Sequence, residues 1–302
     1  MTTRRCAFLA MDSNEGWSVD VELAIAPLEA RGWQVELVPW RRPAVDWSRF
    51  DAVYIGTPWD YPEDAERFLA VLAAIDASGA VLVNELTLVR WNVRKTYLRD
   101  LAERGADVVP GRWLERYDAA AVQRAAQAFD APRIVVKPVV GANAADTFLL
   151  SREEADAARE RLAAVFGERP LIVQPYLEAI ESDGELSLFY FGGELSHAIR
   201  KVPRSGDFRV QEEHGASITA IVPEAGAVRA AERVLSLVSP RPVYARCDLV
   251  RGPGGRFLLM ELELIEPSLY LRMDAGAAER FAGAFDRHVG VRLRDRSRPG
   301  AV

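Results

Sequence analysis

Three carboxylates near the C-terminal end of the sequence have a spacing that could hold a metal ion. The stretch from 243 to 265 is typical of a hairpin, with Asp248 on its first strand and Glu261 and Glu263 on its second. If Gly254–Gly255 is a two-residue turn, the register places Asp248 directly opposite Glu261. Glu261 and Glu263 are two residues apart, so they point to the same face of the sheet. The sequence therefore predicts that the three side chains share one patch of sheet.

Such a patch needs positive charge, because like charges that face each other across strands repel and raise each other's pKa. Mg²⁺ suits it, since this hard cation takes oxygen ligands and commonly uses one or two carboxylates together with water and substrate phosphates. The alternative is a solvated face on which Arg246 is the counter-charge. The apolar flanks of the motif favour a buried face, and we expect one or two Mg²⁺ ions, with Mn²⁺ as a substitute. Arg246 is then either a structural counter-ion or the anchor of a substrate carboxylate.

Basic residues elsewhere in the sequence suit a phosphate group. Lys137 ends an apolar strand-like run and precedes a loop that contains Gly141, and a lysine buried at such a place needs a partner such as phosphate. Arg200 and Lys201 end a second strand, and a flexible basic stretch with Arg209 follows. Alone, each of these features is more often ordinary surface. Together with the carboxylates they predict magnesium-assisted phosphoryl transfer, with Arg200, Lys201 and Arg209 as the catalytic candidates.

The first 90 residues predict a small parallel sheet covered by helices, because strand-like and helix-like segments alternate. We expect strands at 6–11, 34–38, 52–55 and 80–83, and helices at 19–31 and 62–77. Ligands of such sheets bind beyond the carboxyl ends of the strands, where Trp59 and Asp60 follow the third strand. Asp60 is therefore a candidate to hold a substrate ammonium group. Trp59 is a candidate substrate contact, and ordinary packing explains it equally well.

The pattern of elements changes after residue 90. We expect helices at 93–104, 151–166, 223–238 and 275–288, strands at 133–140 and 171–174, and two hairpins at 185–202 and 243–265, followed by a frayed tail at 292–302. We divide the chain into an N-terminal α/β domain at 1–90 and two α+β subdomains at 91–172 and 173–302, the last of which carries the metal site. The fold class is α/β, with α+β character in the second part.

Composition and charge exclude several classes of protein. With 302 residues, 49% of them hydrophobic, and a net charge of −6, the chain is a folded protein without the basic surface that favours nucleic acid or an anionic membrane. Its three histidines lack zinc spacing, and Cys6 and Cys247 lie in strand-like runs as buried thiols. Neither a disulfide framework nor a cleavable apolar N-terminus is expected, so we predict a cytoplasmic protein. A homodimer is the common expectation for such a protein.

From about residue 84 to 275 these motifs resemble the ATP-grasp superfamily, in its glutathione-synthetase-like branch. QPYLEAIESDGELSLFYFGGELSHAIRKVP resembles the hinge strand and hairpin of that branch, and RSGDFRVQEEHG its grasping loop. The resemblance implies that two α+β subdomains clasp ATP, with residues 91–172 as the lid. It implies that Lys95 and Lys137 bind the nucleotide, that Glu185 contacts the ribose, and that the carboxylate triad ligates magnesium. The implied adenine hinge consists of Gln174, Pro175, Tyr176 and Leu177.

Three features depart from the pattern of this family. Glu263 stands where the third metal ligand is usually asparagine, which leaves the number of metal ions open. Ser187 stands where an arginine is common, so one of the three catalytic candidates would have to supply that charge. The loop at 141–145 is poorer in glycine than usual, which leaves the nucleotide affinity open.

Within the superfamily, the pairing of TPWDY with RWNxxKxYLxDL and ELELIEPSLYL is most similar to the O-ureidoserine cyclo-ligases of D-cycloserine biosynthesis and their relatives. The similarity implies an ADP-forming carboxylate–amine ligase that works through an acyl phosphate on a small amino-acid-like substrate, cyclised on itself or joined to a second molecule. Ser268, which follows the metal strand, is a further candidate substrate contact. The alternative is a nucleotide-binding regulator or carrier partner without ligase turnover, although a pure binder has no need of a third carboxylate.

Overall fold

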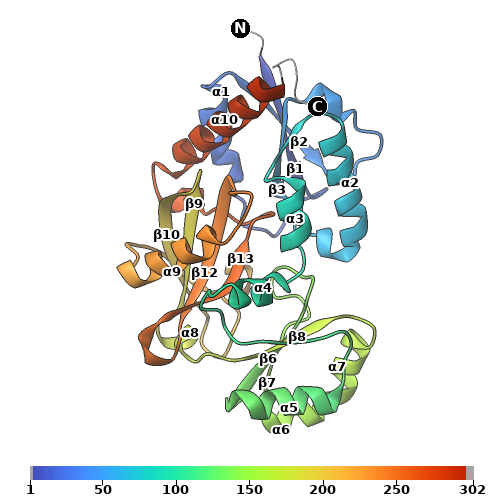
Figure 1. Cartoon of the computed structure of the whole chain (residues 1–302), viewed down its shortest axis with the longest axis vertical. Coiled ribbons are helices and arrows are strands. Elements are labelled where there is room, and N and C mark those ends of the chain that lie inside the picture. Colours follow the sequence, from blue (N-terminus) through green and yellow to red (C-terminus); the bar gives the residue numbers. More distant parts are fainter. Residues whose placement is uncertain (1–2, 297–302) are drawn as a thin grey trace.

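The computed structural model describes residues 3–296, in which three β-sheets follow one another along the long axis of the molecule (Figure 1). The first is a four-stranded parallel sheet with the order β2-β1-β3-β4, which confirms the predicted parallel sheet. Its strands are β1 (Arg4–Ala10), β2 (Trp33–Pro39), β3 (Ala52–Thr57) and β4 (Val81–Val83).

Helices cover both faces of this sheet because successive residues of β1 alternate between two apolar clusters. Ala7 and Leu9 face α2 (Ala65–Ala77), whereas Cys6 and Phe8 face α1 (Ile25–Glu29) and the last helix, α10 (Ala277–Arg296). The predicted helix at 19–31 is wrong in its first part, where a 3₁₀ turn precedes the five-residue α1.

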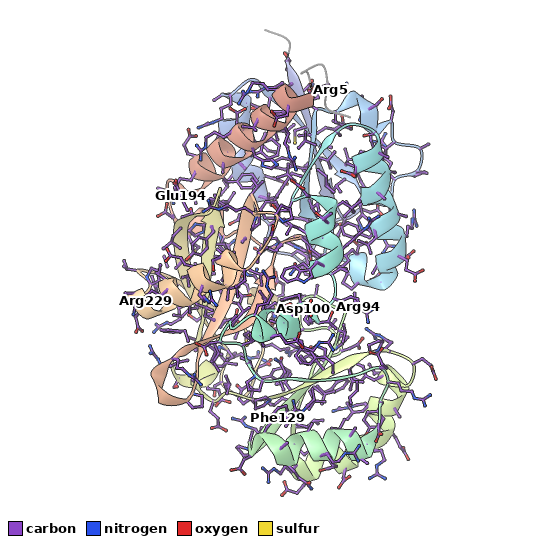
Figure 2. All side chains as sticks on the ribbon, in the orientation of Figure 1. Arg5, Arg94, Asp100, Phe129, Glu194 and Arg229 are labelled. Atoms are coloured by element: carbon purple, nitrogen blue, oxygen red, sulfur yellow. The ribbon has the colours of Figure 1, made fainter. Side chains whose placement is uncertain are left out.

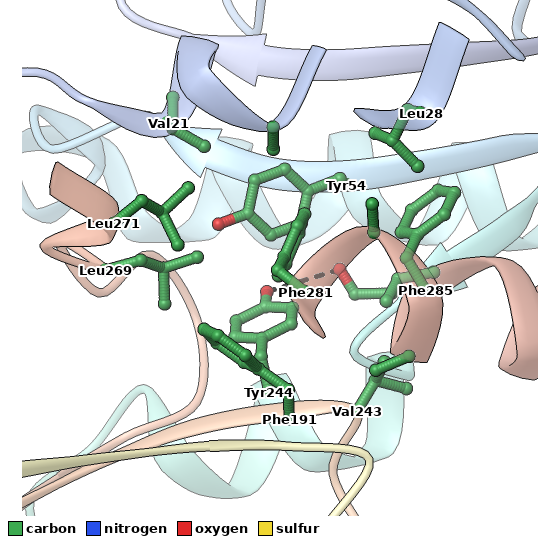
Figure 3. Packing of buried hydrophobic residues seen from close by; sticks show 14 of the residues in the cluster. Val21, Leu28, Tyr54, Phe191, Val243, Tyr244, Leu269, Leu271, Phe281 and Phe285 are labelled. Atoms are coloured by element: carbon green, nitrogen blue, oxygen red, sulfur yellow. Dashed lines mark hydrogen bonds between the residues drawn. The ribbon is translucent and has the colours of Figure 1, made fainter. Parts of the chain in front are cut away.

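The C-terminal helix returns to the first sheet (Figure 1). Phe281 lies edge-on to Tyr54, with ring centroids 5.1 Å apart, in the apolar cluster that also holds Tyr244 of the central sheet (Figure 3). The expected fraying is wrong over 292–296, because α10 continues there and Arg292 forms an ion pair with Glu85. The remainder of the expected tail, 297–302, lies outside the described residues.

The second sheet lies in the centre of the molecule and is antiparallel, with the order β11-β10-β9-β12-β13. Helix α9 (Ala225–Ser236) packs on one face of it through Ala227, Ala231 and Val234. Its strands are β9 (Glu185–Phe191), β10 (Glu194–Val202), β11 (Ser217–Ile221), β12 (Tyr244–Arg251) and β13 (Phe257–Glu263).

The predicted pairing of the carboxylate hairpin is confirmed, although the predicted turn is wrong. The turn is the longer 3₁₀ segment Pro253–Gly255. A longer turn alone would move every pair by one residue and turn the carboxylates away from each other. A β-bulge after Asp248 absorbs the extra residue, since Asp248 pairs with Glu261 whereas Leu249 pairs with Leu259.

The third sheet lies at the other end of the molecule, with the order β5-β8-β6-β7 and helices on one side (Figure 1). Ser151 and Glu154 form the predicted capping box, but the predicted helix divides at Ala158. Strands β5 and β7 and helix α5 were not predicted. The elements are β5 (Arg112–Leu114), α5 (Ala119–Phe129), β6 (Arg133–Pro138), β7 (Phe148–Ser151), α6 (Arg152–Ala157), α7 (Arg159–Phe166) and β8 (Leu171–Pro175).

Two short helices lead from the first sheet toward the other two, in place of the single helix predicted at 93–104. They are α3 (Leu86–Asn92) and α4 (Tyr97–Glu103), and the segment between them contains Lys95. Figure 2 marks this junction by Arg94 and Asp100, between the central and third sheets. The remaining elements are α8 (Ala179–Ser182) and 3₁₀ turns at Val21–Ala24, Trp47–Arg49, Tyr61–Asp64, Glu212–His214 and Leu271–Met273.

Within residues 3–296, none of the helices combines the length and the hydropathy that a membrane span requires. The division into domains at residues 90 and 172 stays a prediction.

Candidate active site

A cavity of about 220 Å³ takes its lining from segments of all three sheets. Trp59 reaches it from the loop after β3, Lys137 from β6 of the third sheet, and Asp248 from β12 of the central sheet. The sequence-predicted residues that line it are Trp59, Lys95, Lys137, Tyr176, Glu185, Lys201, Arg209, Arg246, Asp248, Glu261, Glu263 and Ser268. Residues far apart in the chain are thus brought to one place.

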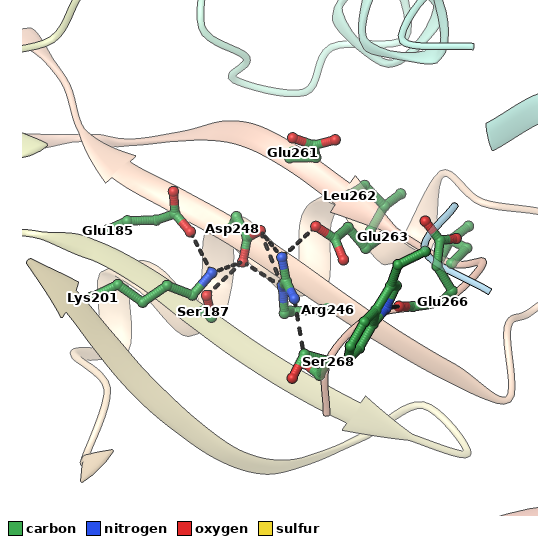
Figure 4. A network of polar contacts seen from close by, with 12 residues as sticks. Glu185, Ser187, Lys201, Arg246, Asp248, Glu261, Leu262, Glu263, Glu266 and Ser268 are labelled. Carbon is green, nitrogen blue, oxygen red and sulfur yellow. Dashed lines mark hydrogen bonds and ion pairs between the residues drawn. The ribbon is translucent and has the colours of Figure 1, made fainter. Parts of the chain in front are cut away.

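The three carboxylates lie on neighbouring strands, and each is held by a positive side chain. Figure 4 shows the pairs that Arg246 forms with Asp248 and Glu263. Arg246 donates to Asp248 at 2.9 Å and also to Glu263, while Glu261 pairs with Lys95 at 2.9 Å. Arg246 is thus the ionic partner of two of the three carboxylates.

Ser187 has a place in this network that the sequence reasoning did not assign. Its hydroxyl donates to Asp248 at 2.6 Å, and the two residues pair across β9 and β12. Lys201, on the next strand, lies 3.6 Å from the same carboxylate. A short neutral donor therefore occupies this position, and the positive charge beside Asp248 comes from Lys201 and Arg246 (Figure 4).

The carboxylates differ in their tendency to ionise. Burial opposes the charge of Asp248, but Arg246 and Lys201 outweigh it and hold the pKa of Asp248 below its usual range. Burial likewise opposes the charge of Glu261, and Lys95 lowers its pKa. Burial raises the pKa of Glu263 to about 7, because the neighbouring carboxylates add to the effect and Arg246 offsets only part of it. Glu263 is thus the member of the patch that takes up a proton near neutral pH.

Two of the lysines in the cavity are held in place by acceptors. The ammonium of Lys95 donates to the carbonyl oxygen of Gly141 at 2.7 Å and to Glu261. Lys95 thereby ties the loop after β6 to strand β13. Lys201 is 5% exposed and donates to Glu185 at 2.7 Å. Burial opposes the charge of Lys201, but the carboxylates of Asp248 and Glu185 outweigh it and raise its pKa.

Lys137 differs from these two lysines. No hydrogen bond or ion pair joins its ammonium to any residue in 3–296 that the structure describes. Burial lowers the pKa of Lys137, and the carboxylate of Glu261 opposes this only in part. A cation in such a place is costly without a ligand, and a phosphate group would supply the missing acceptor.

Five of the predicted site residues do not line the cavity: Asp60, Gln174, Pro175, Leu177 and Arg200. Arg200 is exposed on the opposite face of β10 from Lys201, because neighbouring residues of a strand point to opposite sides. The carboxylate of Asp60 is engaged elsewhere, since Trp40 donates to it at 2.6 Å and Arg41 at 2.8 Å. Gln174 is buried and donates to the carbonyl of Val109.

The cavity also contains residues that the sequence reasoning did not single out. Trp17 packs against Trp59 with ring centroids 5.1 Å apart, and the Trp59 indole donates to the carbonyl oxygen of Glu266 at 2.8 Å. Glu266 and Tyr270 lie on the segment after β13 and line the cavity. The position of Glu266 just after the predicted metal motif is a signal in the sequence that could have identified it. Trp17 lies in an irregular loop, and the sequence contains no comparable signal for it.

The donor chemistry of Asp248, Glu261 and Glu263 fits Mg²⁺, since all three supply carboxylate oxygens in a cavity that also contains lysine and arginine side chains. Their side chains are turned toward Arg246 and Lys95, however. Within the described residues, no group of three or more acidic, histidine or cysteine side chains has an arrangement that would hold a metal ion. A metal would therefore replace these cationic partners.

The cavity combines three lysines, two arginines and six carboxylates between a parallel sheet and two antiparallel sheets, charges that suit a ligase of the ATP-grasp class. Residues 6–84 match the family model described as D-cycloserine synthetase DcsG, N-terminal domain. The cycloserine biosynthesis protein DcsG of Streptomyces lavendulae is 35% identical over 268 residues, which cover 84% of this chain and 88% of that protein. The chain belongs to the ATP-grasp ligases, in the family of D-cycloserine synthetase.

Solved structures agree with this family. A crystal structure of D-cycloserine synthetase DcsG has a TM-score of 0.84 at 31% identity, and the match covers 94% of this chain and 99% of that chain. The ATP-grasp ligase PsnB, solved with a phosphomimetic variant of its minimal precursor, Mg and ADP, has a TM-score of 0.65 at 18% identity and covers 95% and 99%. PsnB shares the fold. The predicted superfamily and the predicted enzyme class, an ATP-grasp ligase, are confirmed.

Proposed function

We propose that this protein is an ADP-forming carboxylate–amine ligase that activates a small amino-acid-like substrate as an acyl phosphate. The observation that carries the proposal is the convergence of Lys95, Lys137 and Lys201 with three carboxylates in one cavity. The relatives named D-cycloserine synthetase support a substrate whose own nitrogen closes a ring. We therefore propose intramolecular cyclisation in preference to the joining of two molecules.

The nucleotide would lie between the third and central sheets. Lys137, which lacks an acceptor among the described residues, would donate to a phosphate oxygen, and Lys95 would hold the loop at Gly141 against it. Tyr176 lines the cavity at the hinge end, where the adenine would lie. Glu185 would accept from the ribose while Lys201 holds its carboxylate in position.

Asp248, Glu261 and Glu263 would hold magnesium. When bound, Mg²⁺ supplies positive charge to the phosphate oxygens and orients the group that is transferred. Arg246, released from part of its present pairing, would then neutralise the substrate carboxylate and the transferring phosphoryl group. Lys201 would keep Asp248 ionised throughout.

The reaction would have two steps. A carboxylate oxygen of the substrate attacks the γ-phosphorus of ATP, and ADP leaves with the electrons of the broken P–O bond. The amine nitrogen then attacks the carbonyl carbon, the C–N bond forms, and phosphate leaves and takes up the amine proton. The cations of the cavity stabilise the negative charge that develops in both steps, as is typical when positioning and electrostatics dominate catalysis.

The proposal is tested by incubating the purified protein with ATP, Mg²⁺ and a panel of amino acids and their ureido and hydroxamate derivatives, with hydroxylamine as a surrogate nucleophile. We expect acid-dependent release of phosphate together with hydroxamate, and the loss of both in Lys137→Ala and Glu261→Ala. ATP binding without turnover across the whole panel would refute the proposal and favour a regulator. The number of ions, the use of Mn²⁺, a cytoplasmic location and a homodimer stay predictions.

A further inference from the structure

Glu266 is a carboxylate in the cavity for which the proposed ligase chemistry has no use. It lies on the segment after β13 and is partly buried, beside Glu263 at the end of the hairpin farthest from Lys201 (Figure 4). No salt bridge joins its side chain to any of the residues that the structure describes. Each carboxylate of the proposed metal site, in contrast, has a cationic partner.

Aromatic side chains lie around Glu266 on the same side of the cavity. The indole N–H of Trp59 donates to the backbone carbonyl of Glu266, which fixes the orientation of the ring. Trp17 packs on Trp59, and Tyr61 also lines the cavity. The faces of such rings attract cations electrostatically, and a nearby carboxylate adds to that attraction.

We propose that Glu266, with Trp17 and Trp59, forms the subsite that binds the α-ammonium group of an amino-acid-like substrate. A primary ammonium fits because it gives the unpaired carboxylate a hydrogen-bonding cation and gives the rings a cation to face. A metal ion fits less well, since aromatic rings supply no oxygen ligands. Trp59 and Glu266 lie on segments that follow strands of the first and central sheets, so the subsite lies where these two sheets meet at the cavity.

The acidic residue that the sequence favoured for this role, Asp60, is engaged elsewhere in the structure. Asp60 follows the third strand of the first sheet, but Arg41 and Trp40 already satisfy its carboxylate outside the cavity lining. Glu266 lines the cavity beside Trp59, and no salt bridge joins its carboxyl group to a described residue. Burial and the neighbouring Glu263 raise the pKa of Glu266, and a bound ammonium group would offset both effects. This subsite deepens the proposed function and rests on it for the identity of the substrate.

The test uses binding and needs no turnover. Serine, as each enantiomer, and 3-hydroxypropanoate, which is serine without its α-ammonium, are titrated by calorimetry into the full chain saturated with a non-hydrolysable ATP analogue and Mg²⁺. We expect one enantiomer of serine to bind about 10- to 100-fold more tightly than 3-hydroxypropanoate, the range that a hydrogen-bonded charge gives. In Glu266→Gln this preference should fall to about twofold or less, because the amide keeps the shape and loses the charge.

A control is Glu103→Gln, which removes an exposed negative charge on α4 outside the cavity lining. It should keep the preference for serine, so a general effect of charge is separated from a contact with Glu266. Equal binding of serine and 3-hydroxypropanoate, no binding of either, or an unchanged preference in Glu266→Gln would each overturn the subsite.

The outcomes also separate the subsite from the proposed function. A preference that depends on Glu266 in a protein that activates no carboxylate would support the subsite and refute the ligase proposal. Hydroxamate formation by a protein that binds serine and 3-hydroxypropanoate equally well would support the ligase proposal and refute the subsite.

Discussion

Replacement of Lys137 by methionine should make the protein more stable and far less active. The ammonium of Lys137 has no partner among the described residues, and burial lowers its pKa although carboxylates lie nearby. At every pH below the lowered pKa, the charged form of Lys137 is therefore less favourable in the folded protein than in the unfolded chain, where water solvates it. Methionine keeps the length of the side chain and removes the charge.

The expected magnitude follows from the surroundings of each lysine. An unpaired buried charge costs several kcal/mol, and the partial exposure of Lys137 reduces this, so Lys137→Met should raise the free energy of unfolding by about 1 kcal/mol. The matched variant is Lys95→Met. It leaves the carbonyl of Gly141 and the carboxylate of Glu261 without their donor, and should lower the free energy of unfolding by about 2 kcal/mol.

Both variants should lose activity, because each removes a cation from the proposed phosphate site; we expect a fall in kcat/KM of about 100-fold or more. Stability is measured by thermal unfolding without nucleotide, where the two variants should shift Tm in opposite directions by about 2 °C or more. Acid-dependent phosphate release measures the activity. A Lys137→Met protein with a lower Tm, or with unchanged kcat/KM, would refute the reasoning.

Three further predictions concern the metal site, an acid-sensitive histidine and the contact between two sheets. Glu263→Gln should raise the Mg²⁺ concentration for half-maximal ATP turnover about tenfold or more, and an unchanged Mg²⁺ titration would exclude Glu263 as a ligand. Burial lowers the pKa of His197 to about 4, so the neutral ring is favoured in the folded state and stability is lost as pH falls from 6.5 toward 4. The free energy of unfolding should fall by about 1.4 kcal/mol per pH unit more steeply in the wild type than in His197→Gln, as urea titrations at each pH would show; equal slopes would contradict it. Tyr244→Phe leaves the carbonyl of Ile265 without its 2.6 Å donor and should cost about 1 to 3 kcal/mol, measured by urea unfolding with turnover as a control for the active site. A loss of activity without a loss of stability would show that this assignment is wrong.

The carboxylate hairpin shows how a correct prediction can rest on an incorrect detail. Alternation along the strands predicts that Glu261 and Glu263 share a face, and turn geometry predicts the pairing with Asp248. The turn is one residue longer than expected, and the bulge after Asp248 restores the pairing. Bulges depend on the packing of both strands, so a single sequence does not reveal them.

The region between the first sheet and the hinge was harder to predict, because its elements are short. Strand β5 has three residues, and the segment with Lys95 separates two seven-residue helices where one longer helix was expected. Helix α5 had a usable signal, since Asp118 caps it through the backbone N–H of Ala121. Tertiary packing decides such short segments more than local propensity does.

The candidate site could be predicted where strand alternation determines which way a side chain points. It was harder to predict where hydrogen-bond and ion-pair partners determine whether a side chain is available. Alternation separates Lys201 from Arg200, and the structure places only Lys201 in the cavity. The engagement of Asp60 by Arg41 depends on a strand end and a loop that meet in space, which the sequence does not show. Glu266 lies five residues after Glu261, but its lack of a salt bridge to the described residues is visible only when all its neighbours are known.

The most direct test of the central proposal follows oxygen atoms. The best acid of the panel is prepared with ¹⁸O in its carboxylate and incubated with the protein, ATP and Mg²⁺, and the released phosphate is examined by mass spectrometry. An acyl phosphate transfers one carboxylate oxygen to each phosphate, so we predict one ¹⁸O per phosphate and none in the reaction without acid. Phosphate that is released in an acid-dependent reaction but contains no ¹⁸O would contradict carboxylate activation by this route.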